Sequence, residues 1–116
     1  MVDYFQIKYL ISDCFYYEVF VNNRSYDQAA GICYEAFLEY ISSRGIESVI
    51  AKCAIIMLKY RHKININTSD INSMKYILEK SKMLNEKNFL NEESMDFFSE
   101  ELVFIREKVE EIENIG

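Results

Sequence analysis

The segment from Ile46 to His62 constrains the fold most, because its residues are apolar on nearly every side of a helix. Its sequence is IESVIAKCAIIMLKYRH, and the apolar run CAIIML lies between Lys52 and Lys59. A helix that is apolar all round is buried against other elements. A bilayer span needs about 20 apolar residues, so this run is too short to cross a membrane. We therefore expect the segment to be the central helix of a bundle.

The rest of the chain is also easier to build from helices than from strands. It has 116 residues, no proline and three glycines, so few residues would break a helix. Half of the residues are apolar, which is enough for a core, and the length suits one domain. We expect a single all-α domain over residues 1–116, a compact bundle of about five helices around a central apolar helix.

Apolar residues recur every three or four positions in four further segments, which predicts a helix in each. These segments are residues 3–21, 26–43, about 70–85 and about 91–114. Ser25 and Gln28 form the capping-box pattern at the start of the second helix, and Gly45 suits a left-handed C-cap at its end. The remaining caps are expected at Thr68 or Ser69 and at Asn91.

No pattern of carboxylates and histidine points to a metal site or to catalysis. Glu35 and Glu39 share one face of a helix, but a di-iron site in a helix bundle also needs Glu-x-x-His pairs. The single histidine, His62, has no acid at that offset. We expect the two glutamates to be a solvated flank and His62 to lie at the surface. No cofactor and no metal are expected.

The three cysteines, Cys14, Cys33 and Cys53, have no metal-ligand spacing. Each lies in an apolar periodic segment, where a free cysteine packs as a small apolar residue. A redox or catalytic thiol is the alternative. With no hydrolase, nucleotide-binding or metalloprotease motif either, the sequence predicts a protein that is not an enzyme.

Negative charge is concentrated in the last predicted helix. The net charge is −6, and from Glu86 onward the chain has ten acids and three bases. Projected as a helix, one side carries Glu93, Asp96, Glu100, Glu107 and Glu111, with Val103 and Phe104 among them. The opposite side is a heptad-like apolar seam of Met95, Phe98, Leu102, Ile105, Val109 and Ile112.

Apolar residues among acids have two explanations: a neighbouring helix covers that side, or a basic partner binds there through these seven residues. A nucleic-acid partner is not expected, because the protein is acidic. The only basic cluster, Lys59–Lys63, is accounted for by the stabilisation of positive charge at a helix end.

The stretch RSYDQAAGICYEAFLEY, followed by VIAKCAIIMLKYRHKI, a shorter helix and an acidic terminal helix, resembles immunity proteins of bacterial polymorphic toxin systems. The nearest type is the all-helical one called immunity protein family three, and the likeness covers residues 4–80. It implies a non-enzymatic antitoxin that binds a cognate toxin domain and occludes its active site. Many such toxins are nucleases with basic clefts, which an acidic partner suits.

Two other hypotheses for the function remain. The chain could be a small regulator or scaffold that self-associates as a homodimer through the seam of its last helix, or a viral helical protein that binds host factors. The first residues lack the pattern of a signal peptide, so we expect a cytoplasmic protein with no membrane partner.

Overall fold

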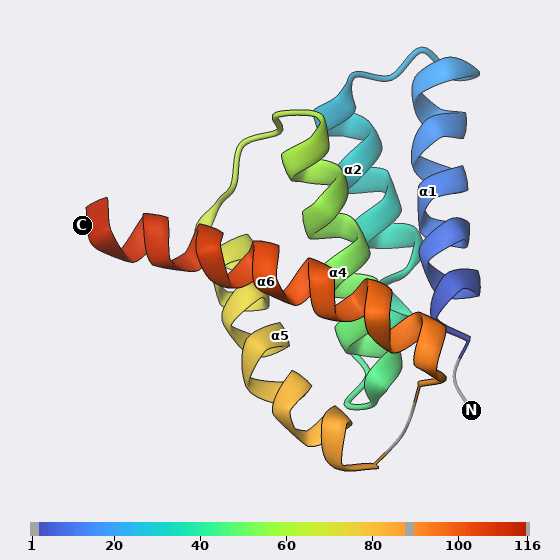
Figure 1. Cartoon of the computed structure of the whole chain (residues 1–116). Helices are drawn as coiled ribbons and strands as arrows, with labels where there is room; N and C mark the ends of the chain where they lie inside the picture. Colours follow the sequence, from blue (N-terminus) through green and yellow to red (C-terminus); the bar gives the residue numbers. More distant parts are fainter. Residues whose placement is uncertain (1–2, 88–89, 116) are drawn as a thin grey trace.

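The computed structural model describes residues 3–87 and 90–115, and every element in these residues is a helix (Figure 1). The elements are α1 (Tyr4–Phe20), α2 (Tyr26–Ala36), α3 (Leu38–Ile41), α4 (Ile46–Arg61), α5 (Thr68–Lys87) and α6 (Glu92–Ile115). The predicted all-α bundle is confirmed. It has five main helices and one short helix, α3.

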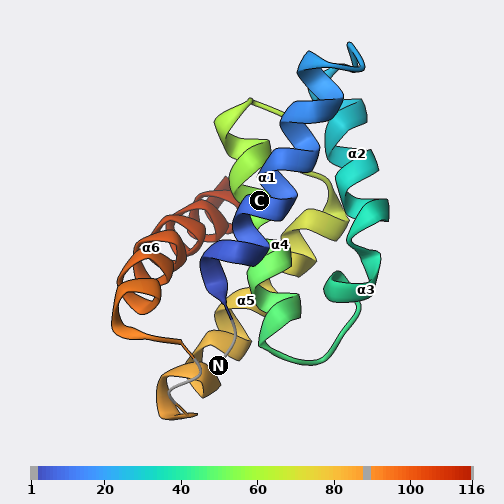
Figure 2. The same cartoon turned by 90° about the vertical axis from the view of Figure 1, so that its right-hand side faces the viewer.

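The last helix, α6, runs across the helices that precede it. It contacts α1 through Phe98 and Tyr4, whose ring centroids are 5.8 Å apart. It contacts α5 through an ion pair of 3.3 Å between Glu113 and Lys75. Figure 2 shows α6 on one side of α1 and shows α2 and α3 on the other. The first and last helices of the chain are therefore in contact.

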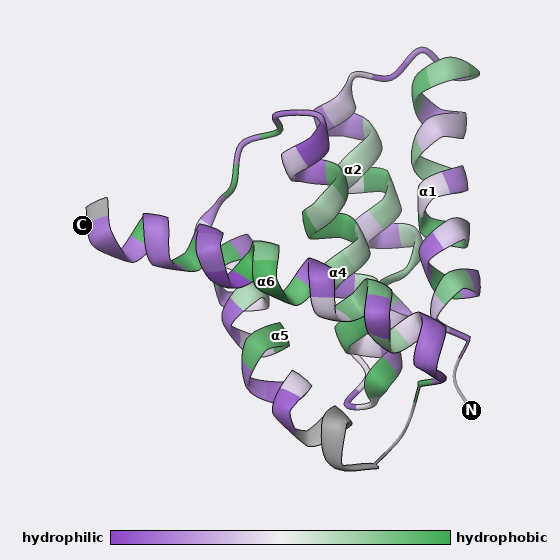
Figure 3. Ribbon diagram, in the orientation of Figure 1, coloured by the Kyte–Doolittle hydropathy of each residue, from purple (hydrophilic) through white to green (hydrophobic). Residues whose placement is uncertain are grey.

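Helix α4 is the centre of the core, as its sequence predicts. It is buried along almost its whole length, and Ile50 and Ile56 are each 1% exposed. In Figure 3 its ribbon is mostly green and turns purple at the C-terminal end, where Lys59 and Arg61 lie. The positive charges are thus at the helix end that favours them.

The predicted helix over residues 26–43 is in fact two helices. Its start is as expected, because Ser25 and Gln28 make both hydrogen bonds of a capping box, each 3.1 Å long. The helix is interrupted at Phe37, whose φ and ψ are −108° and 19°. The predicted left-handed C-cap at Gly45 is wrong. Gly45 has φ −93° and ψ −171° and is the N-cap of α4, because the chain has already turned at Ser42–Arg44.

The cap of α5 is Asn67 and not Thr68 or Ser69. The Asn67 side chain accepts a hydrogen bond of 2.8 Å from the Asp70 amide, and the Asp70 carboxylate accepts one of 3.0 Å from the Asn67 amide. This reciprocal pair satisfies two amides that a helix start leaves free. The predicted cap of α6 is confirmed, since Asn91 accepts a hydrogen bond of 2.8 Å from the Ser94 amide. None of the described helices is both long and apolar enough to span a membrane.

Candidate functional site

The side of α6 that carries the predicted acids is open to solvent. We call it the acidic face of α6, and its exposed residues are Glu93, Asp96, Glu100, Val103, Glu107 and Glu111. Val103 is 51% exposed although it is apolar. Within the described residues, the one ion pair of this face joins Glu111 to Lys108 of the same helix at 3.4 Å. The other four carboxylates are exposed and form no ion pair with the side chains that the structure describes.

Phe104 was predicted to belong to this surface, but it is half-buried at the edge of the face. Its ring meets the ring of Tyr60 in α4 edge-on, with centroids 5.3 Å apart. The ammonium group of Lys108 lies 5.3 Å from the Phe104 centroid and 5.6 Å from that of Tyr60. For Phe104, therefore, a neighbouring helix covers the aromatic ring. The helical projection of the sequence placed Phe104 among the acids, because a projection of α6 alone does not include its contact with Tyr60 of α4.

The opposite side of α6 is the predicted seam, and it is covered within the chain. Phe98 and Ile105 have no exposed surface, and Leu102 and Val109 are also buried. Met95 and Ile112 are partly buried against the same core. A homodimer through this seam would have to remove α6 from its own bundle. The seam instead packs α6 against the core of its own bundle, so the acidic face points to solvent.

One further carboxylate of α6 is buried. Glu101 lies 3.1 Å from the ammonium group of Lys8 in α1. Burial raises the pKa of the Glu101 carboxyl to about 7, against the opposing effect of the nearby ammonium. Burial also lowers the pKa of Lys8. Glu101 therefore anchors α6 to α1 and is not part of the exposed face.

The single histidine is not a simple surface residue. His62 stacks on Tyr26, with ring centroids 4.5 Å apart, and on Phe15 at 5.2 Å. Its Nε2 atom lies 2.9 Å from the Tyr16 hydroxyl. Burial, and then the neighbouring charge of Arg61, lower the pKa of His62. Sequence reasoning missed this stack because its members come from α1, α2 and the end of α4.

The other residues considered for chemistry lie apart. Glu35 and Glu39 are exposed, Cys33 and Cys53 are buried, and Cys14 is partly buried. Burial raises the pKa of the Cys53 thiol to about 12 and also raises that of Cys33, so both thiols stay protonated near neutral pH. In the part of the chain that the structure describes, no three His, Cys, Asp or Glu side chains gather as metal ligands would.

The outer side of α1 and its C-cap is a second exposed surface, and it carries several large apolar side chains. Its large exposed side chains are Tyr9, Leu10, Tyr17, Phe20 and Val21. Phe20 is the most open of them, with 71% of its surface exposed. Helix α1 packs against α2, α4 and α6, and these side chains lie on the part of it that stays exposed, together with Gln6 and Asp13. Two of these five side chains belong to the nine tyrosines of the chain.

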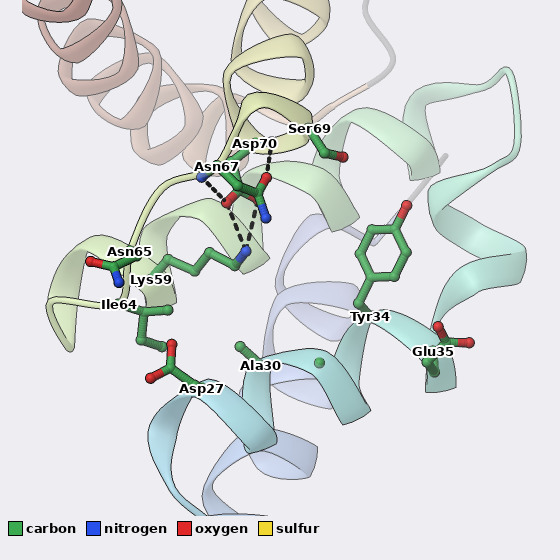
Figure 4. A pocket seen from close by; sticks show the side chains of 11 residues that line it. Asp27, Ala30, Tyr34, Glu35, Lys59, Ile64, Asn65, Asn67, Ser69 and Asp70 are labelled. Atoms are coloured by element: carbon green, nitrogen blue, oxygen red, sulfur yellow. Dashed lines mark hydrogen bonds and ion pairs between the residues drawn. The ribbon is translucent and has the colours of Figure 1, made fainter.

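A pocket of about 510 Å³ lies between α2 and the connection from α4 to α5 (Figure 4). It is lined by Asp27, Ala30, Gly31, Tyr34, Glu35, Lys59, Ile64, Asn65, Asn67, Ser69 and Asp70. Sequence reasoning did not find it, because its two walls are about thirty residues apart in the chain.

No family model, no curated protein and no solved structure matches the chain. The chemistry of the exposed surfaces is then the guide to function. An open row of carboxylates on a firmly anchored helix attracts cationic groups, and the exposed Val103 within it offers an apolar contact once water is excluded.

Proposed function

We propose that this protein is an immunity protein, an antitoxin that neutralises a cognate toxin domain with a basic surface, such as a nuclease. The acidic face of α6 would be the binding surface. The observation that supports this proposal is the row of exposed carboxylates, of which only Glu111 has a cationic partner within the described residues.

The spacing of these carboxylates supports binding over simple solvation. Asp96 and Glu100 are four residues apart, as are Glu107 and Glu111, so like charges are neighbours on the helix surface. Such pairs destabilise a helix by about 0.2–0.5 kcal/mol each. A basic partner would relieve this repulsion, and the gain would appear as binding energy.

The arrangement also suits rapid association. Opposite charges on two proteins raise the rate of encounter, and salt reduces this effect. Val103, exposed among the acids, would then contribute after encounter by losing its contact with water. Because the seam fixes α6 on the bundle, little conformational freedom would be lost on binding.

The experiment uses the product of the neighbouring gene as the candidate toxin. Its C-terminal domain is expressed in a test host with and without this protein, and survival is measured. Wild type should restore growth, whereas the double substitution Glu100→Lys and Glu107→Lys should fail to do so. The purified pair should associate more slowly as salt is raised.

The matched control is the double substitution Glu39→Lys and Glu79→Lys. It changes the net charge equally and alters exposed carboxylates of α3 and α5. It should protect the host as wild type does. Equal protection by the α6 variant would refute the acidic face as the binding surface. A neighbouring product that is not toxic, or is not inhibited, would refute the antitoxin function itself.

A further inference from the structure

The pocket of Figure 4 lies away from the acidic face, because its residues come from α2, α4, α5 and the α4–α5 connection. One wall is formed by α2, with Asp27, Gly31, Tyr34 and Glu35. The other wall contains Lys59 and the residues around Asn65 and Asp70.

In the second wall, the charged side chains of Lys59 and Asp70 form an ion pair with each other. The Lys59 ammonium lies 2.8 Å from both carboxylate oxygens of Asp70. One of these oxygens also accepts a hydrogen bond of 3.0 Å from the Asn67 amide. Lys59 is therefore already neutralised by a partner held in place by the start of α5. It does not offset the carboxylates on the opposite wall.

The α2 wall carries the unpaired negative charge. Among the described residues, Asp27 and Glu35 are exposed and have no ion-pair partner. They are eight residues apart and so lie on one side of α2, about 12 Å from each other along its axis. Tyr34, 40% exposed, points from α2 toward the start of α5 (Figure 4).

Gly31 lies midway between the two acids, four residues from each. Glycine within a helix is unfavourable, and the fold gives no reason for it here. No described glycine has a positive φ, and a Cβ atom at Gly31 would meet nothing within 4 Å. Because Gly31 has no side chain, the helix backbone is exposed at the wall of the pocket.

We propose that this pocket receives an arginine side chain displayed by a protein partner. A guanidinium group is flat, so it can lie along the backbone at Gly31 and against the ring of Tyr34. Asp27 and Glu35, at the two ends of this wall, supply the opposite charge, and the nearer carboxylate accepts its hydrogen bonds. A lysine ammonium is compact and strongly hydrated, and it uses neither flat surface as well.

This site is independent of the toxin and of the acidic face of α6. It is tested by titrating the ¹⁵N-labelled protein with N-acetyl-arginine amide. The chain has three glycines, so their amide signals are easily resolved, and Gly31 reports on the pocket while Gly45 serves as an internal control. The Gly31 signal should shift with a midpoint of about 1–10 mM, as expected for a ligand of this size.

Three further probes define the chemistry. The citrulline analogue has the same shape without the charge and should bind at least about tenfold more weakly, since a charged hydrogen bond is lost. The lysine analogue should also bind more weakly than N-acetyl-arginine amide. Free arginine should bind more weakly than this blocked form, because Asp27 and Glu35 repel its carboxylate. Stronger binding of free arginine would instead indicate a site for the amino acid and overturn the proposal.

Variants locate the site. The double substitution Asp27→Asn and Glu35→Gln should abolish the arginine shift, and Gly31→Leu should block the pocket. Glu39→Gln, which removes a carboxylate outside the pocket, should leave binding unchanged. The proposal is overturned if the Gly31 signal does not shift with up to about 100 mM ligand, ten times the upper end of the expected range, or if the Glu39 variant loses binding equally. Thermal unfolding of each variant shows that the fold is retained.

Discussion

The ammonium group of Lys8 lies 3.1 Å from the carboxylate of Glu101, and this contact joins the first helix to the last. The two residues are 93 positions apart. A buried ion pair adds little net stability, because removing both charges from water is costly. Its geometry fixes how α6 lies on α1. Lys8 and Glu101 thereby help to direct the acidic face of α6 outward.

The first prediction concerns the pH dependence that Glu101 causes. Its pKa is about 7 in the folded protein and near the ordinary value of 4.5 when unfolded. The folded state therefore binds more protons between these values, and stability falls as pH rises through this range. The loss reaches up to about 3 kcal/mol. Substitution Glu101→Gln should remove this decline in the free energy of unfolding, measured with urea from pH 4.5 to 8.

The control is Glu100→Gln, which changes the exposed neighbour of Glu101. It should keep the wild-type slope of stability against pH. If the curves of stability against pH were parallel for wild type and Glu101→Gln, burial would not raise the pKa of the Glu101 carboxyl.

The second prediction compares two ion pairs of different burial. The side chains of Lys59 and Asp70 are 14% and 11% exposed, whereas those of Lys75 and Glu113 are 52% and 55% exposed. Substitution Asp70→Asn leaves Lys59 unpaired and weakens the start of α5, and it should cost about 2–4 kcal/mol. Glu113→Gln should cost less than about 0.5 kcal/mol. Urea unfolding of both variants measures the difference, and similar losses would contradict it.

Local patterns were sufficient to predict most of the helices. The apolar α4, the seam of α6 and the capping box at Ser25 each depend on residues within a few turns of one another. The interruption at Phe37 and the role of Gly45 were not predictable in this way. They depend on where α3 must turn to let α4 enter the core, which no short stretch of sequence encodes.

The candidate site was only partly predictable for the same reason. Helical periodicity places the exposed acids of α6 correctly, but the burial of Phe104 depends on Tyr60, 44 residues earlier. The stack on His62 and the pocket beside Gly31 likewise unite segments from different helices. Charge patterns along one helix are visible in a sequence, whereas contacts between helices need the fold.

The third prediction tests the central position of α4. Ile56 is 1% exposed and Leu10 is 44% exposed. Substitution Ile56→Lys buries an unpaired charge, which costs more than about 4 kcal/mol and is comparable with the whole stability of a small domain. The variant should lose its helical circular dichroism at 25 °C. Leu10→Lys should unfold within a few degrees of wild type, and a folded Ile56→Lys variant would contradict the central role of α4.

The last prediction uses His62, the only histidine, whose ring signals can be followed by NMR without ambiguity. Its pKa should lie below 6.5, because burial and the charge of Arg61 disfavour the imidazolium. Since the folded pKa is lowered, the stability that His62 contributes is present above pH 6.5 and is lost as pH falls through the folded pKa, opposite in sign to Glu101.

Substitution Arg61→Gln should raise the pKa of His62 toward 6.5, because it removes the nearby positive charge. Lys63→Gln, the control, removes a positive charge from the exposed residue on the other side of His62 and should have the smaller effect. Tyr16→Phe removes the hydroxyl that can donate to the neutral Nε2 atom at 2.9 Å, so it should also raise the pKa. A pKa at or above 6.5 in wild type would mean that the rings of Phe15 and Tyr26 do not shield His62 from water.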